Sequence, residues 1–95
     1  MKYYPVFLDI HARKCLVVGG GAVGTRKVLS LVACGAIVTV VSPEATEKLK
    51  DLARQGVITL KMRTYCPEDM QGKFLVFGAT DNDALNRQIN QDAEN

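Results

Sequence analysis

The chain has 95 residues, of which 47% are hydrophobic and 23% charged, the size and balance of one soluble globular domain spanning residues 1–95. Twelve basic and ten acidic side chains leave a net charge of +2 and are spread along the sequence. Because the basic residues form no block, the sequence does not predict a nucleic-acid or membrane partner. The longest apolar run is far shorter than the ~20 residues that span a bilayer. The N-terminus also lacks a secretory signal, so we expect a cytoplasmic protein.

Three cysteines and one histidine are the candidate metal ligands: Cys15, Cys34, Cys66 and His11. No C-x-x-C pair occurs, so the spacing does not provide a four-ligand zinc site, and we predict no bound metal. We interpret the cysteines as reduced and inert, with Cys15 and Cys34 acting as small hydrophobes in a strand and a helix. His11 lies in a polar turn and is expected to be solvated.

The first half of the chain reads as strand, helix, strand. Lys14–Val18 is an apolar run that ends at three glycines, which is typical of a buried parallel strand. After the glycines, apolar residues recur with helical spacing until Gly35, which we expect just beyond the end of the helix. Ile37–Val41 is β-branched throughout and predicts a second buried strand.

The segment Ser42-Pro43-Glu44 predicts the start of a second helix. Ser42 has the side chain of an N-cap, Pro43 suits the first helical position, and Glu44 would lie in the first turn. The apolar stripe of this helix is Ala45, Leu49, Leu52 and Ala53, and Gly56 is expected to end it.

Two more strands and a helix complete the pattern. Residues 57–62 alternate in polarity, which predicts a third strand near a sheet edge. A loop or short helical turn should follow between residues 64 and 73, and residues 74–78 predict a fourth buried strand. We expect Thr80 or Asp81 to cap a last helix that directs Leu85 and Ile89 inward. Strands alternating with helices predict an α/β fold: a mainly parallel sheet of order 3-2-1-4 with helices on both faces.

Gly19, Gly21 and Gly24 fit the pattern G-x-G-x-x-G between the first predicted strand and helix. Gly19 would allow the tight turn, Gly21 the approach of a pyrophosphate, and Gly24 close packing of helix on strand. The backbone N–H groups of Ala22 and Val23 would face the anion at the helix N-terminus. This context predicts a Rossmann-type NAD-binding domain; the alternative is a glycine turn that serves packing alone.

Two positions after the second predicted strand, Ser42 and Glu44, are the candidates for selecting the dinucleotide. Ser42 stands at the end of the second strand, where an acid commonly binds the ribose hydroxyls. The nearest acid, Glu44, could accept those hydroxyls or could only favour the N-terminus of the following helix. Because no basic side chain follows Ser42 before Lys48, the sequence favours NAD over NADP.

A second group of polar residues follows the fourth predicted strand. In a sheet of order 3-2-1-4 this loop and the glycine loop flank the same crevice. The backbone of Ala79 and Thr80 could therefore contact the cofactor. The alternative is that Thr80 or Asp81 only caps the last helix, with Asp83 complementing the helix dipole.

Several segments together resemble the dehydrogenase module of the siroheme synthase family: Tyr4-Pro5-Val6-Phe7-Leu8, residues 16–24 with Arg26-Lys27, residues 38–44, and Ala79-Thr80-Asp81-Asn82 with Leu85-Asn86. The resemblance implies a precorrin-2 dehydrogenase, which oxidises precorrin-2 to sirohydrochlorin with NAD. In members that are also sirohydrochlorin ferrochelatases, a lyase activity, Fe²⁺ is inserted next. It further implies a cytoplasmic homodimer in porphyrin and siroheme biosynthesis, and NAD contacts at Ala22, Val23, Pro43 and Glu44.

The chain departs from that family in two respects. Gly24 stands where many members carry alanine, which the glycine fingerprint tolerates. In the family, the proposed catalytic aspartate and the dimerisation and substrate-binding regions come later, so we expect them beyond Asn95 and name no catalytic residue. We expect the 95-residue chain alone to bind NAD weakly and to lack dehydrogenase activity.

Two other functions share the same motifs. One is a regulatory Rossmann module that senses NAD(H); such modules usually carry an acid at the position of Ser42. The other is the NAD-binding part of a different oxidoreductase. A short-chain reductase is disfavoured because no tyrosine is followed by lysine at the fourth position.

Overall fold

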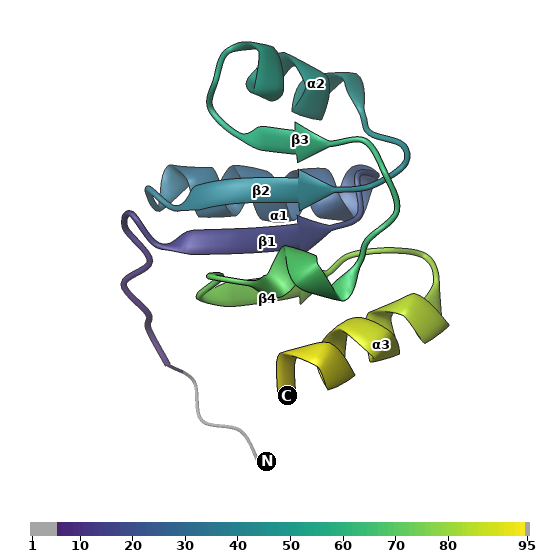
Figure 1. The fold of residues 1–95 in the computed structure, drawn as a ribbon. Coiled ribbons are helices and arrows are strands. Elements are labelled where there is room, and N and C mark those ends of the chain that lie inside the picture. The colour runs from purple at the N-terminus through teal and green to yellow at the C-terminus, as the bar shows by residue number, and fades with distance from the viewer. Residues whose placement is uncertain (1–5, 95) are drawn as a thin grey trace.

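The computed structural model describes residues 6–94, in which four strands alternate with helices (Figure 1). In chain order the elements are β1 (Lys14–Val18), α1 (Ala22–Ala33), β2 (Ile37–Val41), α2 (Glu47–Arg54), β3 (Thr59–Lys61), the 3₁₀ turn η1 (Pro67–Met70), β4 (Leu75–Gly78) and α3 (Asp83–Glu94). The Tyr4-Pro5 part of the opening motif lies outside the described residues. No helix among those described is long and apolar enough to cross a bilayer.

The four strands form one parallel sheet in the order β3-β2-β1-β4, which confirms the predicted topology. Val17, the fourth of the five residues of β1, lies opposite Val40 of β2 and Phe77 of β4. β1 and β2 have the predicted bounds, because β1 after Lys14 is an apolar run and β2 is a β-branched run, and both can be buried on two faces.

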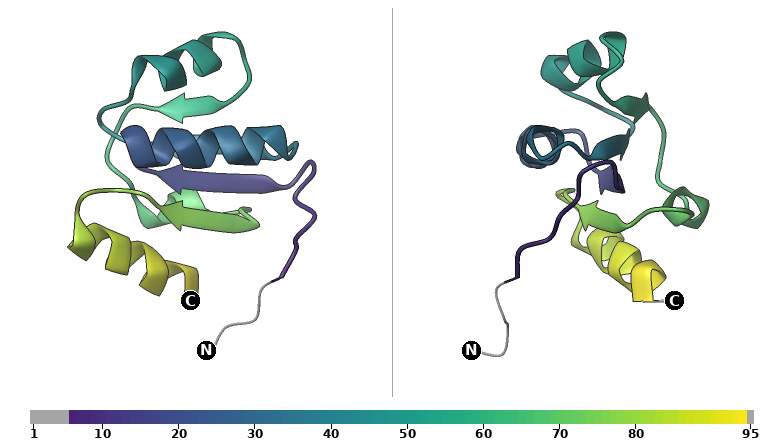
Figure 2. Two further views of the ribbon diagram at one scale, coloured as in Figure 1. Left: turned by 180° about the vertical axis from the view of Figure 1, so that it is seen from behind. Right: turned by 90° about the vertical axis from the view of Figure 1, so that its left-hand side faces the viewer.

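Side chains of β1 alternate between two cores, one on each face of the sheet. Cys15 and Val17 pack in the core beneath α1 and α2, together with Leu49 of α2. Leu16 and Val18 pack on the other face, in a core shared with α3 and the η1 loop. Figure 2 shows α1 and α2 on one side of the sheet and η1 on the other. The prediction of helices on both faces is confirmed.

The two edge strands differ from their predictions. β3 is three residues long rather than six, because the Val57 N–H donates to the carbonyl of Leu52 (2.9 Å) and so belongs to the turn after α2. β4 is half-buried rather than buried, because within residues 6–94 it lies at the edge of the sheet and pairs with β1 alone. Phe74, at the start of the predicted fourth strand, lies outside β4 and is 45% exposed.

The start of α2 was predicted wrongly. Ser42 does not cap a helix: its N–H donates to the carbonyl of Lys61 (3.1 Å), so this residue continues the pairing between β2 and β3. Thr46 is the N-cap, and its hydroxyl accepts the N–H of Leu49. Glu44 therefore precedes the helix, and Glu47 is the acidic residue of the first turn.

The cap of α3 also differs from the prediction. The side chain of Asn82, rather than that of Thr80 or Asp81, accepts the N–H of Leu85 (3.0 Å). Asp83 lies in the first turn as expected. Because threonine, aspartate and asparagine are all good N-caps, three adjacent candidates left the local sequence unable to select one.

The three cysteines lie in different environments. Cys15 is buried as predicted, and burial raises the pKa of its thiol. Cys34 is exposed at the C-terminal end of α1, so the interpretation of this residue as a small hydrophobe was wrong. Cys66 is half-buried among polar groups. His11 is exposed in a turn, as expected.

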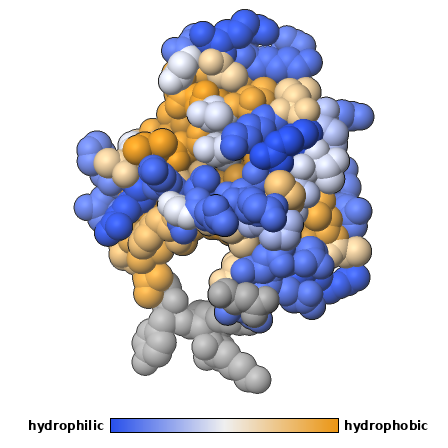
Figure 3. Space-filling view, in the orientation of Figure 1, coloured by the Kyte–Doolittle hydropathy of each residue, from blue (hydrophilic) through white to orange (hydrophobic). Residues whose placement is uncertain are grey.

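Part of the apolar surface stays exposed. Figure 3 shows apolar side chains at the surface between the hydrophilic exteriors of α2 and α3. The described residues include several large hydrophobic side chains that are at least 40% exposed: Val6, Phe7, Leu8, Val23, Leu29, Ile37, Val57, Met62 and Phe74. Of these, Val23 lies in the first turn of α1, beside the glycine loop.

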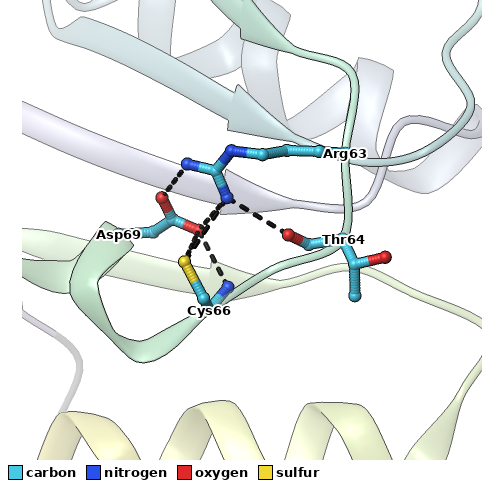
Figure 4. A network of polar contacts seen from close by, with 4 residues as sticks. All are labelled: Arg63, Thr64, Cys66 and Asp69. Carbon is cyan, nitrogen blue, oxygen red and sulfur yellow. Dashed lines mark hydrogen bonds and ion pairs between the residues drawn. The ribbon is translucent and has the colours of Figure 1, made fainter.

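An ion pair folds the long connection between β3 and β4 (Figure 4). The Arg63 guanidinium donates to both carboxylate oxygens of Asp69, at 2.9 and 2.5 Å, and Asp69 also accepts the N–H of Cys66 (2.9 Å). The Asp69 side chain is 4% exposed and that of Arg63 is 43% exposed. The hydrogen bonds from Arg63 lower the pKa of Asp69 to about 2.

From this ion pair we predict that the free energy of unfolding falls at acidic pH. Asp69→Asn should lower the free energy of unfolding by about 1 kcal/mol near neutral pH, since the lost partner is a charged but partly exposed arginine. The folded-state pKa of Asp69 lies below its ordinary value of 3.8. The carboxylate therefore stabilises the fold above about pH 4 and ceases to do so as the pH falls toward 2. Urea unfolding across this range should show the wild-type advantage disappearing.

Asp51→Asn is the matched control, because Asp51 pairs with Arg54 on the surface and both side chains are more than half exposed. Its effect should stay within about 0.5 kcal/mol. An equal loss in the two variants would show that burial of Asp69 contributes nothing.

Candidate dinucleotide-binding site

A cleft of about 690 Å³ lies at the carboxyl ends of the strands, where three loops converge. The loops are residues 19–21 after β1, 42–46 after β2, and 79–82 after β4. Because β1 and β4 are neighbours although helices and strands separate them in sequence, the cleft lies where the strand order reverses. Ligands of open parallel sheets bind at this switch point.

Nearly all the predicted site residues line this one cleft: Gly19, Gly21, Ala22, Val23, Ser42, Pro43, Glu44, Ala79 and Thr80. Gly24 is the exception, because it is buried beneath the loop. Gly20, Ala45, Thr46, Asp81, Asn82 and Leu85 complete the lining.

Each glycine of the motif has a distinct environment. Gly19 has a φ of +128°, and a Cβ there would lie 2.3 Å from the carbonyl oxygen of Ala79. A Cβ at Gly24 would lie 2.1 Å from the carbonyl oxygen of Gly19, so the close helix packing predicted for Gly24 is present. Alanine at this position would require α1 to shift, although the fingerprint admits it. Among the described residues, no atom lies within 4 Å of a Cβ placed at Gly21, so the space beside the cleft is open there.

Gly20 has a role that the motif does not specify. A Cβ here would lie 2.2 Å from the carbonyl oxygen of Glu44, and the Gly20 carbonyl accepts the N–H of Thr46 (2.9 Å). The second position of G-x-G-x-x-G is open to any residue, so the motif gave no signal for this contact. Gly20 allows the 42–46 loop to cross directly over the glycine loop.

The first turn of α1 is suited to an anion. The helix begins at Ala22 after Gly21, which supplies no side-chain cap, and its first turn contains no acidic residue. The first N–H groups of a helix have no partner within the helix, and the dipole adds positive potential there. A pyrophosphate could accept these N–H groups in the space beside Gly21.

The 42–46 loop presents Pro43 and Glu44 to the cleft, and both are exposed. Glu44 lies two residues before the N-cap Thr46, so it is not an acidic residue of the first turn of α2. Its carboxylate stays a predicted acceptor for ribose hydroxyls. Ser42 is 8% exposed and forms the floor of the loop.

The polar groups of Thr80 are all used within the protein. Its hydroxyl donates to Oδ1 of Asn86 (2.7 Å) and accepts the N–H of Asn82 (3.2 Å). Its N–H donates to Oδ1 of Asn86 (3.3 Å), and its carbonyl accepts Nδ2 of Asn86 (3.0 Å). Thr80 can therefore shape the cleft wall, and its N–H is already bonded within the protein. In the sequence, Asn86 stands out only within the family resemblance and has no predicted structural role, because its partner is six positions away.

Asn86→Ala should lower the free energy of unfolding by about 1–2 kcal/mol, because Thr80 loses its partners in a half-buried wall. Asn90→Ala is the matched control: Asn90 is one turn further along α3 and exposed. Its effect should stay within about 0.5 kcal/mol. Urea unfolding of the two variants measures both effects, and equal losses would contradict a clamp by Asn86.

The parallel sheet, the glycine loop at its switch point and the uncapped helix behind it define a Rossmann-type dinucleotide-binding domain. A model of the family described as putative NAD(P)-binding matches residues 6–95. The chain belongs to this family of putative NAD(P)-binding domains.

The resemblance to siroheme synthases is confirmed. The siroheme synthase of Nitrosospira multiformis is 42% identical over 98 aligned residues, which cover 99% of this chain and 21% of that protein. That of Pseudoalteromonas atlantica is 44% identical over 94 residues, covering 99% and 20%. The chain thus spans about one fifth of the length of these relatives. Among solved structures, SirC, a precorrin-2 dehydrogenase, matches with a TM-score of 0.86 and 32% identity, over 93% of this chain and 44% of SirC.

Proposed function

We propose that this chain is the NAD-binding part of a precorrin-2 dehydrogenase, an oxidoreductase that converts precorrin-2 to sirohydrochlorin in siroheme biosynthesis. One observation supports this most strongly: a chain that folds around a dinucleotide-binding cleft is 42% identical, over 99% of its length, to a siroheme synthase. NAD, when bound, would supply the acceptor for the hydride removed from the substrate. The named relatives favour this function over an NAD(H)-sensing module or another oxidoreductase.

The residues present fit a dinucleotide. The open space at Gly21 and the N–H groups of Ala22 and Val23 would hold the pyrophosphate. Pro43 and Glu44 would border the adenosine ribose on the β2 side of the glycine loop. On the β4 side, the wall formed by Ala79 and Thr80 would border the nicotinamide half, and its fixed shape would orient the ring.

NAD is proposed rather than NADP. The 42–46 loop contains no basic side chain to pair with a 2′-phosphate, and it places the Glu44 carboxylate at the cleft, where a phosphate would be repelled. The catalytic residue stays unassigned. Insertion of Fe²⁺ as a substrate, assembly as a homodimer and a cytoplasmic location are further proposals that rest on the resemblance to siroheme synthases.

Two experiments test this function. Calorimetric titration of the chain should show NAD binding more tightly than NADP; tighter binding of NADP would contradict the choice of cofactor. For the reaction, residues 6–95 should replace the matching part of SirC, and NADH absorbance should be followed with precorrin-2 and NAD. We expect turnover that Gly21→Val removes. A folded hybrid that binds NAD but produces no NADH would refute the proposal that this chain serves as the NAD-binding part of a precorrin-2 dehydrogenase.

A further inference from the structure

A chain of hydrogen bonds joins the N-terminus of α2 to the glycine loop. The N–H of Leu49 donates to Oγ1 of Thr46 (3.4 Å), Oγ1 of Thr46 lies 2.8 Å from Oγ1 of Thr25, and the Thr25 hydroxyl donates to the carbonyl of Gly21 (2.8 Å). Thr25 is in α1, whereas Thr46 precedes α2, so the contact joins segments 21 positions apart.

The two ends of this series of hydrogen bonds determine which group donates in each bond. An amide N–H can only donate, and a carbonyl oxygen can only accept. Since each hydroxyl has one proton and that of Thr25 is used on Gly21, the Thr46 hydroxyl must donate to Thr25. Each of the two hydroxyl protons is therefore used in a hydrogen bond. Both are half-buried, which limits competition from water.

Neither local role of these threonines requires the bond between them. Thr46 needs only the N–H of Leu49 to cap α2, and a helical threonine commonly bonds the carbonyl four residues earlier, as Thr25 does with Gly21. The contact between the hydroxyls goes beyond both roles. A second tie reinforces it, because the N–H of Thr46 donates to the carbonyl of Gly20 (2.9 Å).

We propose that Thr25 and Thr46 are positioning residues that hold the 42–46 loop at a fixed distance from the glycine loop. This inference rests on the proposed function, in which the first loop borders the ribose and the second holds the pyrophosphate. A dinucleotide must contact both loops at once, so a fixed spacing removes the cost of ordering them during binding. Thr46 is at the border of the cleft, whereas Thr25 is outside its lining and acts only through its neighbours.

Thr25→Val is the informative variant, because it removes the hydroxyl while Thr46 can still cap α2. NAD and ADP-ribose span both loops, whereas adenosine should reach only the 42–46 loop. We expect Thr25→Val to weaken NAD and ADP-ribose by about 3- to 10-fold, the range of one hydrogen bond, and to change adenosine affinity by less than about twofold. Thr25→Ser, which keeps the hydroxyl, should restore NAD affinity. Calorimetric titration measures each value.

A double-mutant cycle tests the coupling. Thr46→Val should weaken NAD at least as much as Thr25→Val, and the double variant should lose no more than Thr46→Val alone. Thr59→Val is the control, because Thr59 is an exposed threonine of β3 away from the cleft. It should leave all three affinities unchanged.

Amide exchange gives a readout that needs no ligand. In Thr25→Val the N–H of Thr46 should exchange at least several-fold faster, while amides of β1 and β2 keep their protection. Unchanged exchange at Thr46 would overturn the proposal, as would equal weakening of NAD and adenosine or fully additive effects in the cycle. If wild type binds no NAD, the proposed function fails, and the exchange result still decides whether Thr25 fixes the loop.

Discussion

Replacing Gly21 with valine will abolish NAD binding while the fold persists. Gly21 has a φ of −87°, which any residue adopts, and a Cβ there meets nothing within 4 Å. The valine methyl groups would fill the space in which a pyrophosphate must approach the N-terminus of α1. Because valine is a poorer N-cap than glycine, we expect a stability loss of about 1 kcal/mol or less. Calorimetric titration and thermal unfolding measure the two effects.

Gly24→Val is the matched comparison, because it alters the same motif three residues later. Its Cβ would lie 2.1 Å from the carbonyl oxygen of Gly19, against backbone that cannot move aside without shifting α1. We expect this variant to lose stability by several times as much as Gly21→Val. If Gly21→Val bound NAD as wild type does, the pyrophosphate would have to lie elsewhere.

Glu44→Gln will weaken NAD by about 1–3 kcal/mol, the range for a hydrogen bond to a charged group. The reason is loss of the carboxylate that accepts the ribose hydroxyls, whereas stability should stay unchanged because Glu44 precedes α2. The same variant should reduce the preference for NAD over NADP, since a repulsive charge is removed. Titrations with both cofactors measure these changes.

Glu47→Gln distinguishes a contact between Glu44 and the ligand from the stabilisation of α2 by an acidic side chain. Glu47 is the acid in the first turn of α2, so its neutralisation should lower stability by a few tenths to about 1 kcal/mol and leave NAD affinity alone. Similar losses of affinity in the two variants would indicate a general electrostatic effect rather than a contact by Glu44.

Much of the sheet was predictable because its central strands have one dominant signal. After Lys14, β1 is apolar throughout, and β2 is β-branched throughout; both end at glycine or proline signals, so their bounds followed directly. The start of α2 was not predictable in this way. Ser42 and Thr46 are both good caps, and pairing of Ser42 with Lys61 together with the crossing at Gly20 decided between them.

The residues of the site likewise fall into two groups, those that a local sequence pattern predicts and those that it does not. The glycine motif has a local signature, so Gly19, Gly21 and Gly24 could be assigned from spacing alone. Thr25 and Asn86 have no such signature, because each matters through one partner whose position depends on the fold. Sequence patterns identify the loops that surround the cleft, but the contacts that hold those loops in place become visible only in three dimensions.

The different environments of the cysteines bear on how binding can be measured. Cys15 is buried, and the pKa of Cys66 is raised, first by a hydrogen bond with Glu68, so both thiols are poor targets at neutral pH. Cys34 is exposed at the opposite end of α1 from the glycine loop. At 1.5 Å per residue, the helix separates them by about 18 Å. The native sequence thus contains a selective attachment point for a fluorescent reporter that leaves the cleft untouched.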